Sequence, residues 1–306
     1  MTHARAKWVW PAILFAFSLA YRWVFITLSN FDGLYGQDSY EHLRQVLAFR
    51  AWLLDAGESR TGFLWPHGFA VTAFPFTAVL GPTSRAVQSC TTLCGAALIA
   101  LLFELGRRLA PAAGTTVGLL AATIGAIAAQ PVFSSVVIMT DSPALMWATL
   151  AALFLVRGTD SPQKGRWTLA SGTALGMAII TRWQYLLLLP VFVGALLVAR
   201  DSRRRWLTVT AGFAAPALVL MTLHLLMSAQ RPEGFVGHWV LQWRPAHVLL
   251  ADFFTTEGHT VYRLPNWLSY TQLAGSPRFL FPLLGLMIPA GIWSLWRVRA
   301  WFSLVL

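Results

Sequence analysis

Residues 86–105 read AVQSCTTLCGAALIALLFEL, and Arg107 and Arg108 follow almost directly. A helix of about 20 residues crosses the roughly 30 Å hydrocarbon core of a bilayer. Basic residues gather at the cytoplasmic ends of such helices. This stretch therefore predicts a transmembrane helix that ends at a positively charged interface.

The composition of the whole chain agrees with this stretch. Of its 306 residues, 57% are hydrophobic and 11% are charged, and the mean hydropathy is +0.59. A soluble domain of this size is not expected to be so apolar, and the alternating ten-residue pattern of a transmembrane β-barrel is absent. We therefore expect an all-α polytopic membrane protein, with one transmembrane helix bundle over residues 1–306.

Apolar segments of similar character recur along the chain. The expected spans are 8–27, 86–105, 115–133, 143–156, 167–180, 183–199, 206–227 and 279–296. Two longer, more polar stretches, 30–85 and 228–278, are expected to be outer loops. The chain closes on a short apolar run, 301–306, which suggests that the C-terminal part, 201–306, is truncated or compact.

The net charge of +11 comes mostly from short arginine clusters beside the apolar segments. Such clusters indicate topology and contact with anionic membrane lipids, and they argue against a nucleic-acid partner. Residues 1–25 have a basic start and a long apolar run without a small-residue cleavage site, which indicates a retained first span. Cys90 and Cys94, four residues apart in a span, favour packing over a disulfide or a metal site.

The segment 63–80 decides the topology, because it is apolar enough to cross the membrane. If it lies only at the interface, all the basic clusters share one face, as the positive-inside rule requires. These clusters are Arg5/Lys7, Arg107/Arg108, Arg157/Lys164/Arg166, Arg200/Arg203/Arg204/Arg205 and Arg297/Arg299. The same rule requires 167–199 to form two short helices that are broken near Thr181 and Arg182, which leaves a lipid-accessible recess.

Two aspartates follow membrane-length segments and then share the opposite, extracytoplasmic face with Arg182. Ionisable groups near the bilayer are costly and suggest function. Asp38 opens an amphipathic helix and forms a capping-box pattern with Glu41, so an ordinary N-cap is the competing interpretation. Asp141 precedes Ser142 and Pro143, which is also typical of a helix start.

Several motifs in this order resemble the GT-C superfamily of membrane glycosyltransferases. The strings are GQDSYEHLRQVLAFRAWLLDAGES, GFLWPHGFAVTAFPF, SRAVQSCTTLCGAALIALLFELGRRL, SSVVIMTDSPALMWATLAALFLVRG and ASGTALGMAIITRWQYLLLLP. The resemblance is strongest to the branch of protein O-mannosyltransferases and aminoarabinose transferase, and it covers a core module over residues 8–200. The matching features are Asp38, the turn at Trp65-Pro66-His67-Gly68, Arg85, and the pair Arg107/Arg108.

The sequence departs from that family pattern at three positions. His67 replaces the second proline of the turn, Ser39 stands where a second acid is expected, and Arg182 stands where a lysine is frequent. The missing second acid puts metal dependence in doubt. A divalent ion stays open, with Asp38, His42 and Asp141 as the available ligands.

The resemblance implies an inverting transfer of a sugar from a polyprenyl-phosphate donor to an acceptor hydroxyl, carried by a lipid, a glycan or a protein. It places the reaction outside the cytoplasmic membrane of a bacterium, and the lack of a glycine-rich nucleotide motif agrees with a lipid-linked donor. Asp38 is the expected general base. The expected substrate contacts are Asp141, Arg182, His67, Tyr40 and Glu41.

Arginine suits bidentate contact with the leaving phosphate, and Arg182 is the best placed. Arg85, Arg244 and Arg263 are weaker candidates for the same role, since each also fits an interfacial or loop position.

Two other functions fit parts of the sequence. A lipid or solute transporter or flippase could use outward-facing acids and a broken helix pair, but a second broken pair in a repeated half is not found. A catalytically inert relative could act as a scaffold in the cell envelope, since fold does not fix activity.

Overall fold

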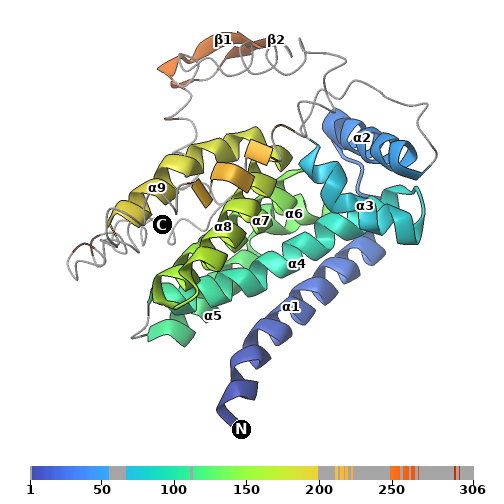
Figure 1. Cartoon of the computed structure of the whole chain (residues 1–306). Coiled ribbons are helices and arrows are strands. Elements are labelled where there is room, and N and C mark those ends of the chain that lie inside the picture. The colour runs from blue at the N-terminus through green and yellow to red at the C-terminus, as the bar shows by residue number, and fades with distance from the viewer. Residues whose placement is uncertain are drawn as a thin grey trace.

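The computed structural model describes residues 2–54, 67–110 and 113–198, with shorter pieces between 211 and 296. Its main body is a bundle of α-helices (Figure 1). The helices are α1 (Thr2–Ser29), α2 (Gly36–Leu54), α3 (Gly68–Leu80), α4 (Ser84–Leu109), α5 (Gly114–Ile127), α6 (Ala129–Val136), α7 (Asp141–Asp160), α8 (Lys164–Thr181), the 3₁₀ helix η2 (Trp183–Leu187) and α9 (Leu188–Val198).

The expected all-α membrane bundle is confirmed. Within the described residues, three helices are long and apolar enough to cross a membrane: Val9–Ser29 of α1, Ser84–Leu109 and Asp141–Thr159. One short antiparallel hairpin, β1 (Asp252–Thr255) with β2 (Gly258–Val261), forms in the expected second loop. The expected spans 206–227 and 279–296 lie largely outside the described residues.

The expected span 115–133 is wrong as a single helix. It forms α5 and α6, which are bent by 59° at Ala128 and together have the length and composition of either a broken span or a re-entrant loop. Pro131 explains the bend, because its ring would clash with the carbonyl of Ile127 in a continuous helix. In the first turn of α6 the same proline is tolerated.

The expected break near Arg182 is confirmed. Helix α8 ends at Thr181, Arg182 has an extended backbone (φ −151°, ψ 113°), and η2 begins at Trp183. Pro190 limits regular helix here, since it excludes the hydrogen bond that would reach back to Leu186. The helical structure is therefore interrupted at Arg182, a residue with a charged side chain.

Helix α4 is the centre of the bundle and packs against α1, α3, α5, α6 and α7. Small residues let the helices approach closely, as in other membrane bundles. A Cβ on Gly118 of α5 would lie 2.5 Å from the carbonyl oxygen of Phe103 in α4. Between α7 and α8, Ser171 Oγ donates a hydrogen bond of 2.8 Å to the carbonyl of Ala151.

Helices α2 and α3 form the expected juxtamembrane pair in the first loop. The 13 residues of α3 reach only about 20 Å, too short for the hydrocarbon core. Its buried side chains pack against α2 around Val46, Phe49 and Phe69. The length of α3 therefore supports an interfacial segment in place of a crossing.

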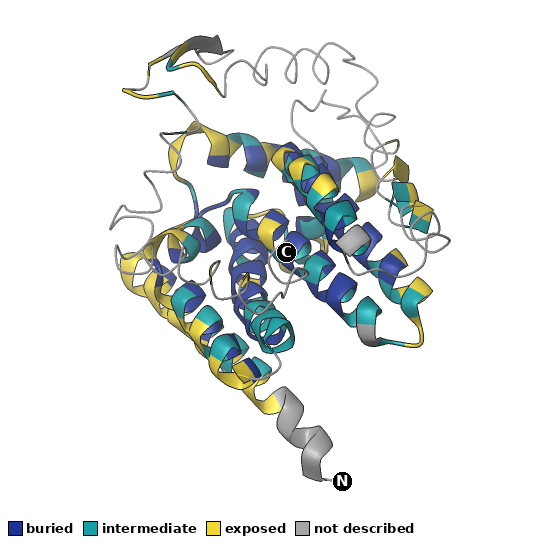
Figure 2. Cartoon of the chain, turned by 90° about the vertical axis from the view of Figure 1, so that its left-hand side faces the viewer, coloured by how far each residue is buried: buried dark blue, intermediate teal, exposed yellow. Residues whose placement is uncertain are grey.

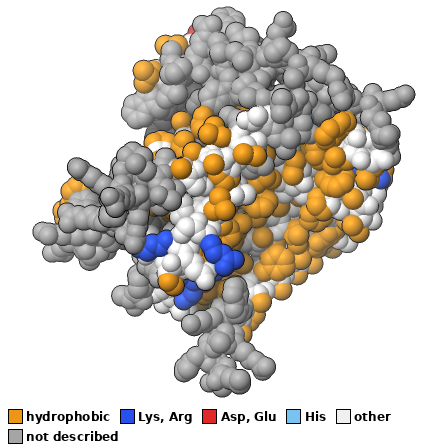
Figure 3. Space-filling view, viewed as in Figure 1, with side chains coloured by type: hydrophobic (Ala, Val, Ile, Leu, Met, Phe, Trp, Pro, Cys, Tyr) orange, Lys and Arg blue, Asp and Glu red, His pale blue; other side chains and the backbone are white. Residues whose placement is uncertain are grey.

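The outer surface of the bundle is apolar. Buried residues concentrate on the central helices, whereas the helix that leads from the N-terminus is mostly exposed (Figure 2). Phe17, Val24 and Leu28 of α1 are 58%, 54% and 83% exposed, and hydrophobic side chains form a broad face on the space-filling view (Figure 3). These side chains suit contact with lipid chains.

Candidate functional site

Asp38 lies in the first turn of α2 and is exposed. The helix begins at Gly36, whose φ of +69° allows the sharp approach of the chain. The Asp38 carboxylate forms no hydrogen bond or ion pair with any residue that the structure describes. Glu41 binds Arg44 instead, at 2.7 Å, so the capping box suggested by the sequence does not form. The carboxylate of Asp38 is therefore accessible to a substrate.

Asp141 and Arg182 form an ion pair. Asp141 is the first residue of α7, and its Oδ1 lies 2.6 Å from NH1 of Arg182, with each side chain about one third exposed. NH1 also lies 3.4 Å from Oγ1 of Thr140. Nε and NH2 of Arg182 bond to none of the described residues, so an anion could reach them.

His42 connects these groups electrostatically. It lies one turn beyond Asp38 and is 4% exposed. Burial lowers the pKa of His42 from 6.5 to about 4, and the charges of Asp38, Arg182 and Asp141 also act on it. Asp38, Asp141 and Arg182 are therefore all within electrostatic range of one buried imidazole, although they come from α2, α7 and the break after α8. Tyr185 of η2 is within electrostatic range of the Asp141–Arg182 pair.

His67 and Gly68 lie beneath the broken helix. His67 is 1% exposed, and its ring centroid lies 6.3 Å from that of Phe49. A Cβ on Gly68 would lie 2.5 Å from the backbone nitrogen of Thr181. The start of α3 thus touches the residue before Arg182, and only glycine permits this approach. Trp65 and Pro66 of the same turn lie outside the described residues.

Tyr40 and Glu41 are the accessible members of the expected substrate set on α2. Tyr40 is 59% exposed, and the side chain of Glu41 is 41% exposed within its pair with Arg44. Glu41 is three residues after Asp38 and lies on the same side of α2, whereas Tyr40, two residues after Asp38, lies on a different side of the helix.

Arg85 anchors the loop that leads to α2. Its NH1 donates to the carbonyl of Phe31 at 2.7 Å and to Oε1 of Gln88 at 3.0 Å. The guanidinium of this weaker phosphate candidate is therefore engaged by the protein itself. Arg263, another such candidate, is exposed, and Arg244 lies outside the described residues.

Gln88 was missed by the sequence analysis. It is fully buried, and its Nε2 donates to the carbonyl of Phe31 at 3.1 Å and to that of Val136 at 2.9 Å. Gly33 (φ +88°) accepts a 2.8 Å bond from the backbone of Ile138. Together these bonds tie the loop before Asp38 to the segment before Asp141. The sequence signal that could have identified Gln88 is a single glutamine, three residues after Arg85, inside an apolar span.

Arg22 was also missed. It is completely buried in α1, where Nε donates to Ser135 Oγ of α6 at 2.6 Å and NH1 donates to the carbonyl of Ser18 at 3.2 Å and to its hydroxyl. A buried arginine in a span is a strong constraint on packing. It joins α1 to the same α6 segment that Gln88 holds.

The described residues contain no group of three or more histidine, cysteine, aspartate or glutamate side chains arranged to hold a metal ion. Asp38 and Asp141, two of the ligands suggested by the sequence, lie within electrostatic range of the third, His42, but the three do not form such a group. The buried His42 instead packs edge-on against Phe69, with ring centroids 5.7 Å apart.

A comparison with protein families identifies the family of this chain. A sequence model of the dolichyl-phosphate-mannose-protein mannosyltransferase family matches residues 66–227, more than half of the chain. The match includes Asp141 and Arg182 and begins after Asp38. No curated protein and no solved structure matches significantly. The resemblance to GT-C enzymes is thereby confirmed, and the chain belongs to the dolichyl-phosphate-mannose-protein mannosyltransferase family as an integral membrane glycosyltransferase.

Proposed function

We propose that this protein transfers a sugar from a polyprenyl-phosphate donor to an acceptor hydroxyl, with inversion at the sugar carbon. The observation that carries the proposal is that an unengaged carboxylate, Asp38, and the Asp141–Arg182 ion pair both lie within electrostatic range of His42. A single displacement requires a general base near the attacking hydroxyl and a cation that binds the leaving phosphate.

Asp38 acts as the general base in this proposal. A hydroxyl nucleophile needs a proton acceptor within hydrogen-bond reach. Asp38 is exposed and makes no bond with a described residue, so its carboxylate can accept the acceptor's proton as the hydroxyl oxygen attacks. Glu41, on the same side of α2, and the exposed Tyr40 are proposed to contact the acceptor. His67 is buried, and its burial favours a supporting role beneath the site.

Arg182 binds the phosphate that leaves. Negative charge grows on that phosphate as the bond to the sugar breaks, and a fixed donor there lowers the barrier. Asp141 and Thr140 hold one nitrogen of the guanidinium, which leaves the other two to face an anion. Asp141 thus orients Arg182 and borders the sugar.

The reaction is proposed to occur on the extracytoplasmic side of a bacterial cytoplasmic membrane. Arg107, Arg108 and Arg157 lie at the other ends of α4 and α7 from the site. Positive residues favour the cytoplasmic face, so the site end faces outward. A lipid, glycan or protein hydroxyl at that surface is the proposed acceptor.

Purified protein in nanodiscs, given a panel of polyprenyl-phosphate sugars, tests the proposal by sugar release. We expect Asp38→Asn to lower the rate by roughly 10² to 10⁴ fold, the usual contribution of a general base. Asp32→Asn is the matched control, because Asp32 is an exposed acid in the same loop whose Oδ1 accepts a bond from Leu34 N, a bond that asparagine retains.

Two results would contradict the proposal. If Asp38→Asn and Asp32→Asn release sugar at the wild-type rate, Asp38 is not the base. If the folded wild type consumes no donor but moves or binds lipid, a transporter or an inert scaffold replaces the transferase.

A further inference from the structure

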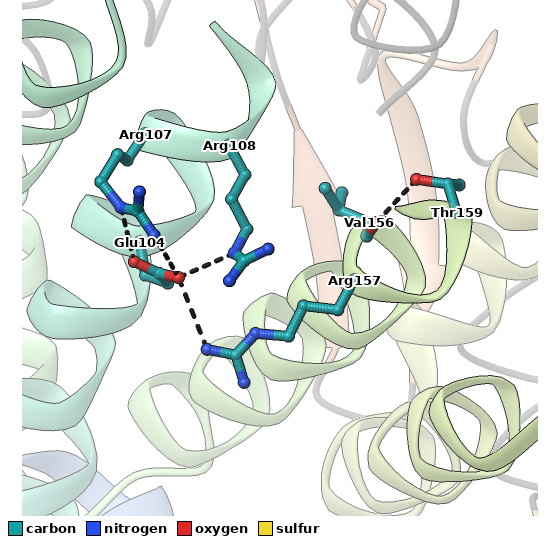
Figure 4. A network of polar contacts seen from close by, with 6 residues as sticks. All are labelled: Glu104, Arg107, Arg108, Val156, Arg157 and Thr159. Carbon is teal, nitrogen blue, oxygen red and sulfur yellow. Dashed lines mark hydrogen bonds and ion pairs between the residues drawn. The ribbon is translucent and has the colours of Figure 1, made fainter. Parts of the chain in front are cut away.

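Three arginines surround one carboxylate at the end of the bundle opposite Asp38 (Figure 4). Glu104 of α4 is 8% exposed and accepts bonds from Arg107 at 2.9 Å and Arg108 at 2.7 Å. Arg157 reaches across from α7 to the same carboxylate at 3.5 Å. We name these four residues the arginine cluster. It lies roughly 25 Å along α7 from Asp141.

The arginine cluster has more positive charge than its acid can neutralise. Glu104 is the only acid that pairs with these arginines among the side chains that the structure describes, so two positive charges remain. Arg107 and Arg108 repel Arg157 electrostatically. Such an excess is costly in a place that is partly shielded from water, and an anion would relieve it.

Donors in the cluster remain open for that anion. Arg108 uses only Nε on Glu104, and its two terminal nitrogens bond to no described residue. Arg157 places NH2 on Glu104, and its NH1 bonds to no residue that the structure describes. The guanidinium of Arg157 is fixed over the ring of Trp167, 5.5 Å from its centroid. The guanidinium groups of the cluster are therefore fixed in position and retain unused hydrogen-bond donors.

The cluster also lies at the level of lipid headgroups. Arg107, Arg108 and Arg157 occur where the membrane-length helices α4 and α7 end, and their side chains are 32%, 28% and 19% exposed. Lys and Arg side chains gather at this end of the space-filling view, beside the broad apolar face (Figure 3). Leu120 of α5 and Leu169 of α8 are 57% and 52% exposed on the neighbouring helices.

We infer that the arginine cluster binds the phosphodiester headgroup of an anionic phospholipid. Arginine forks match phosphate oxygens bidentately, and basic pockets between transmembrane helices bind such headgroups. The phosphate oxygens accept bonds from Arg108 and Arg157, while the acyl chains lie along the exposed leucines. This site is separate from the transfer site and does not depend on the proposed reaction.

Native mass spectrometry of detergent-purified protein with added phosphatidylglycerol or phosphatidylcholine tests the inference. The wild type is expected to retain phosphatidylglycerol at least tenfold more than phosphatidylcholine. Arg108→Gln and Arg157→Gln are expected to abolish that preference. Arg166→Gln removes an equal charge from an exposed residue at the same end and is expected to preserve it. Equal retention of both lipids by the wild type, or equal loss in all three variants, overturns the inference.

A second test measures the unfolding temperature of the wild type as lipid is added. It needs no variant, so a folding defect in a variant cannot affect the result. Phosphatidylglycerol is expected to raise the unfolding temperature saturably, because a ligand that binds the folded state stabilises it. Phosphatidylcholine and inorganic phosphate are expected to leave it unchanged. An unchanged unfolding temperature with phosphatidylglycerol, or an equal rise with inorganic phosphate, contradicts a lipid headgroup site.

Discussion

Arg182 combines two properties at the residue scale. Its backbone closes α8, and its side chain reaches Asp141 at 2.6 Å. The ion pair is only partly buried, so it contributes little to stability. Its value is positional, since a fixed guanidinium with two unused nitrogens is already oriented when an anion arrives.

Two substitutions of Arg182 should separate the contribution of its positive charge from that of its planar, forked guanidinium. We expect Arg182→Gln to lower the rate of sugar release by roughly 10² to 10³ fold, the usual effect of removing one donor to a developing anion. Arg182→Lys keeps the charge but loses the fork, so it should retain intermediate activity. The measurement is kcat and KM for the donor lipid, with Arg166→Gln as the control for loss of an arginine. Wild-type kinetics in Arg182→Gln would remove this residue from the phosphate site.

His42 should make stability depend on pH. Its pKa is about 4 in the folded protein and 6.5 in the reference state, so below pH 6.5 the unfolded state binds the proton more readily. Stability is therefore complete above about pH 6.5 and falls as the pH drops toward 4, by at most about 3 kcal/mol. Asp38, Asp141 and Arg182 face the same imidazole and influence the size of the effect.

Thermal unfolding in detergent between pH 7.5 and 4.5 measures this dependence. We expect the unfolding temperature of the wild type to fall over this window and that of His42→Gln, which cannot titrate, to fall less. Parallel curves for the two proteins would show that the pH dependence has another source.

The site residues were predictable from sequence to different degrees. Asp38, Asp141 and Arg182 could be selected because ionisable groups are costly beside apolar segments. Their proximity depends on tertiary packing between residues far apart in the sequence (Asp141 and Arg182 are 41 positions apart, and Asp38 is more than 100 positions from both), which periodicity does not encode. Gln88 and Arg22 were missed because a polar residue inside an apolar span leaves the span recognisable while its partners stay unknown.

At the scale of elements, charge distribution was more informative than hydropathy. The break at Arg182 followed from the requirement that basic clusters share one face, and the structure has it. The bend between α5 and α6 was missed, since the segment 115–133 is long and apolar enough for one span. Pro131 acts there through backbone sterics, which a hydropathy average does not include.

Gly68 should control the fit between α3 and α8. Gly68→Ala places a methyl group 2.5 Å from the Thr181 nitrogen, and overpacking of this kind costs about 1–3 kcal/mol. We expect a lower unfolding temperature and weaker donor turnover, because the displaced Thr181 carries Arg182 with it. Trp147 of α7, whose Nε1 lies 3.2 Å from Thr72 Oγ1, limits how far α3 can move away.

Gly165→Ala is the matched control for this substitution. A Cβ on Gly165 of α8 meets nothing within 4 Å, so the change should be neutral or slightly stabilising in a helix. If Gly68→Ala unfolds at the same temperature as Gly165→Ala, the close approach at Gly68 is not a constraint.

At the scale of the molecule, α4 and α7 connect two chemically different ends. One end holds Asp38, Asp141 and Arg182, and the other holds the arginine cluster. Arg85 and Gln88 begin α4 by fixing the loop before Asp38, whereas Glu104 ends it by pairing with arginines. The short α3 lies between Asp38 and the start of α4, so its path decides whether Asp38 is on the same side of the membrane as that end of α4.

Cysteine labelling of intact cells should settle this arrangement. The two native cysteines, Cys90 and Cys94, are buried and provide a silent background. Gln37→Cys before Asp38 and Pro82→Cys between α3 and α4 are exposed positions that should both react with a membrane-impermeant maleimide from outside. Gln163→Cys, exposed between α7 and α8, should react only after permeabilisation, because α7 crosses the membrane. Labelling of Gln37→Cys but not Pro82→Cys in intact cells would mean that α3 crosses, and the site proposed here would then be divided between two faces.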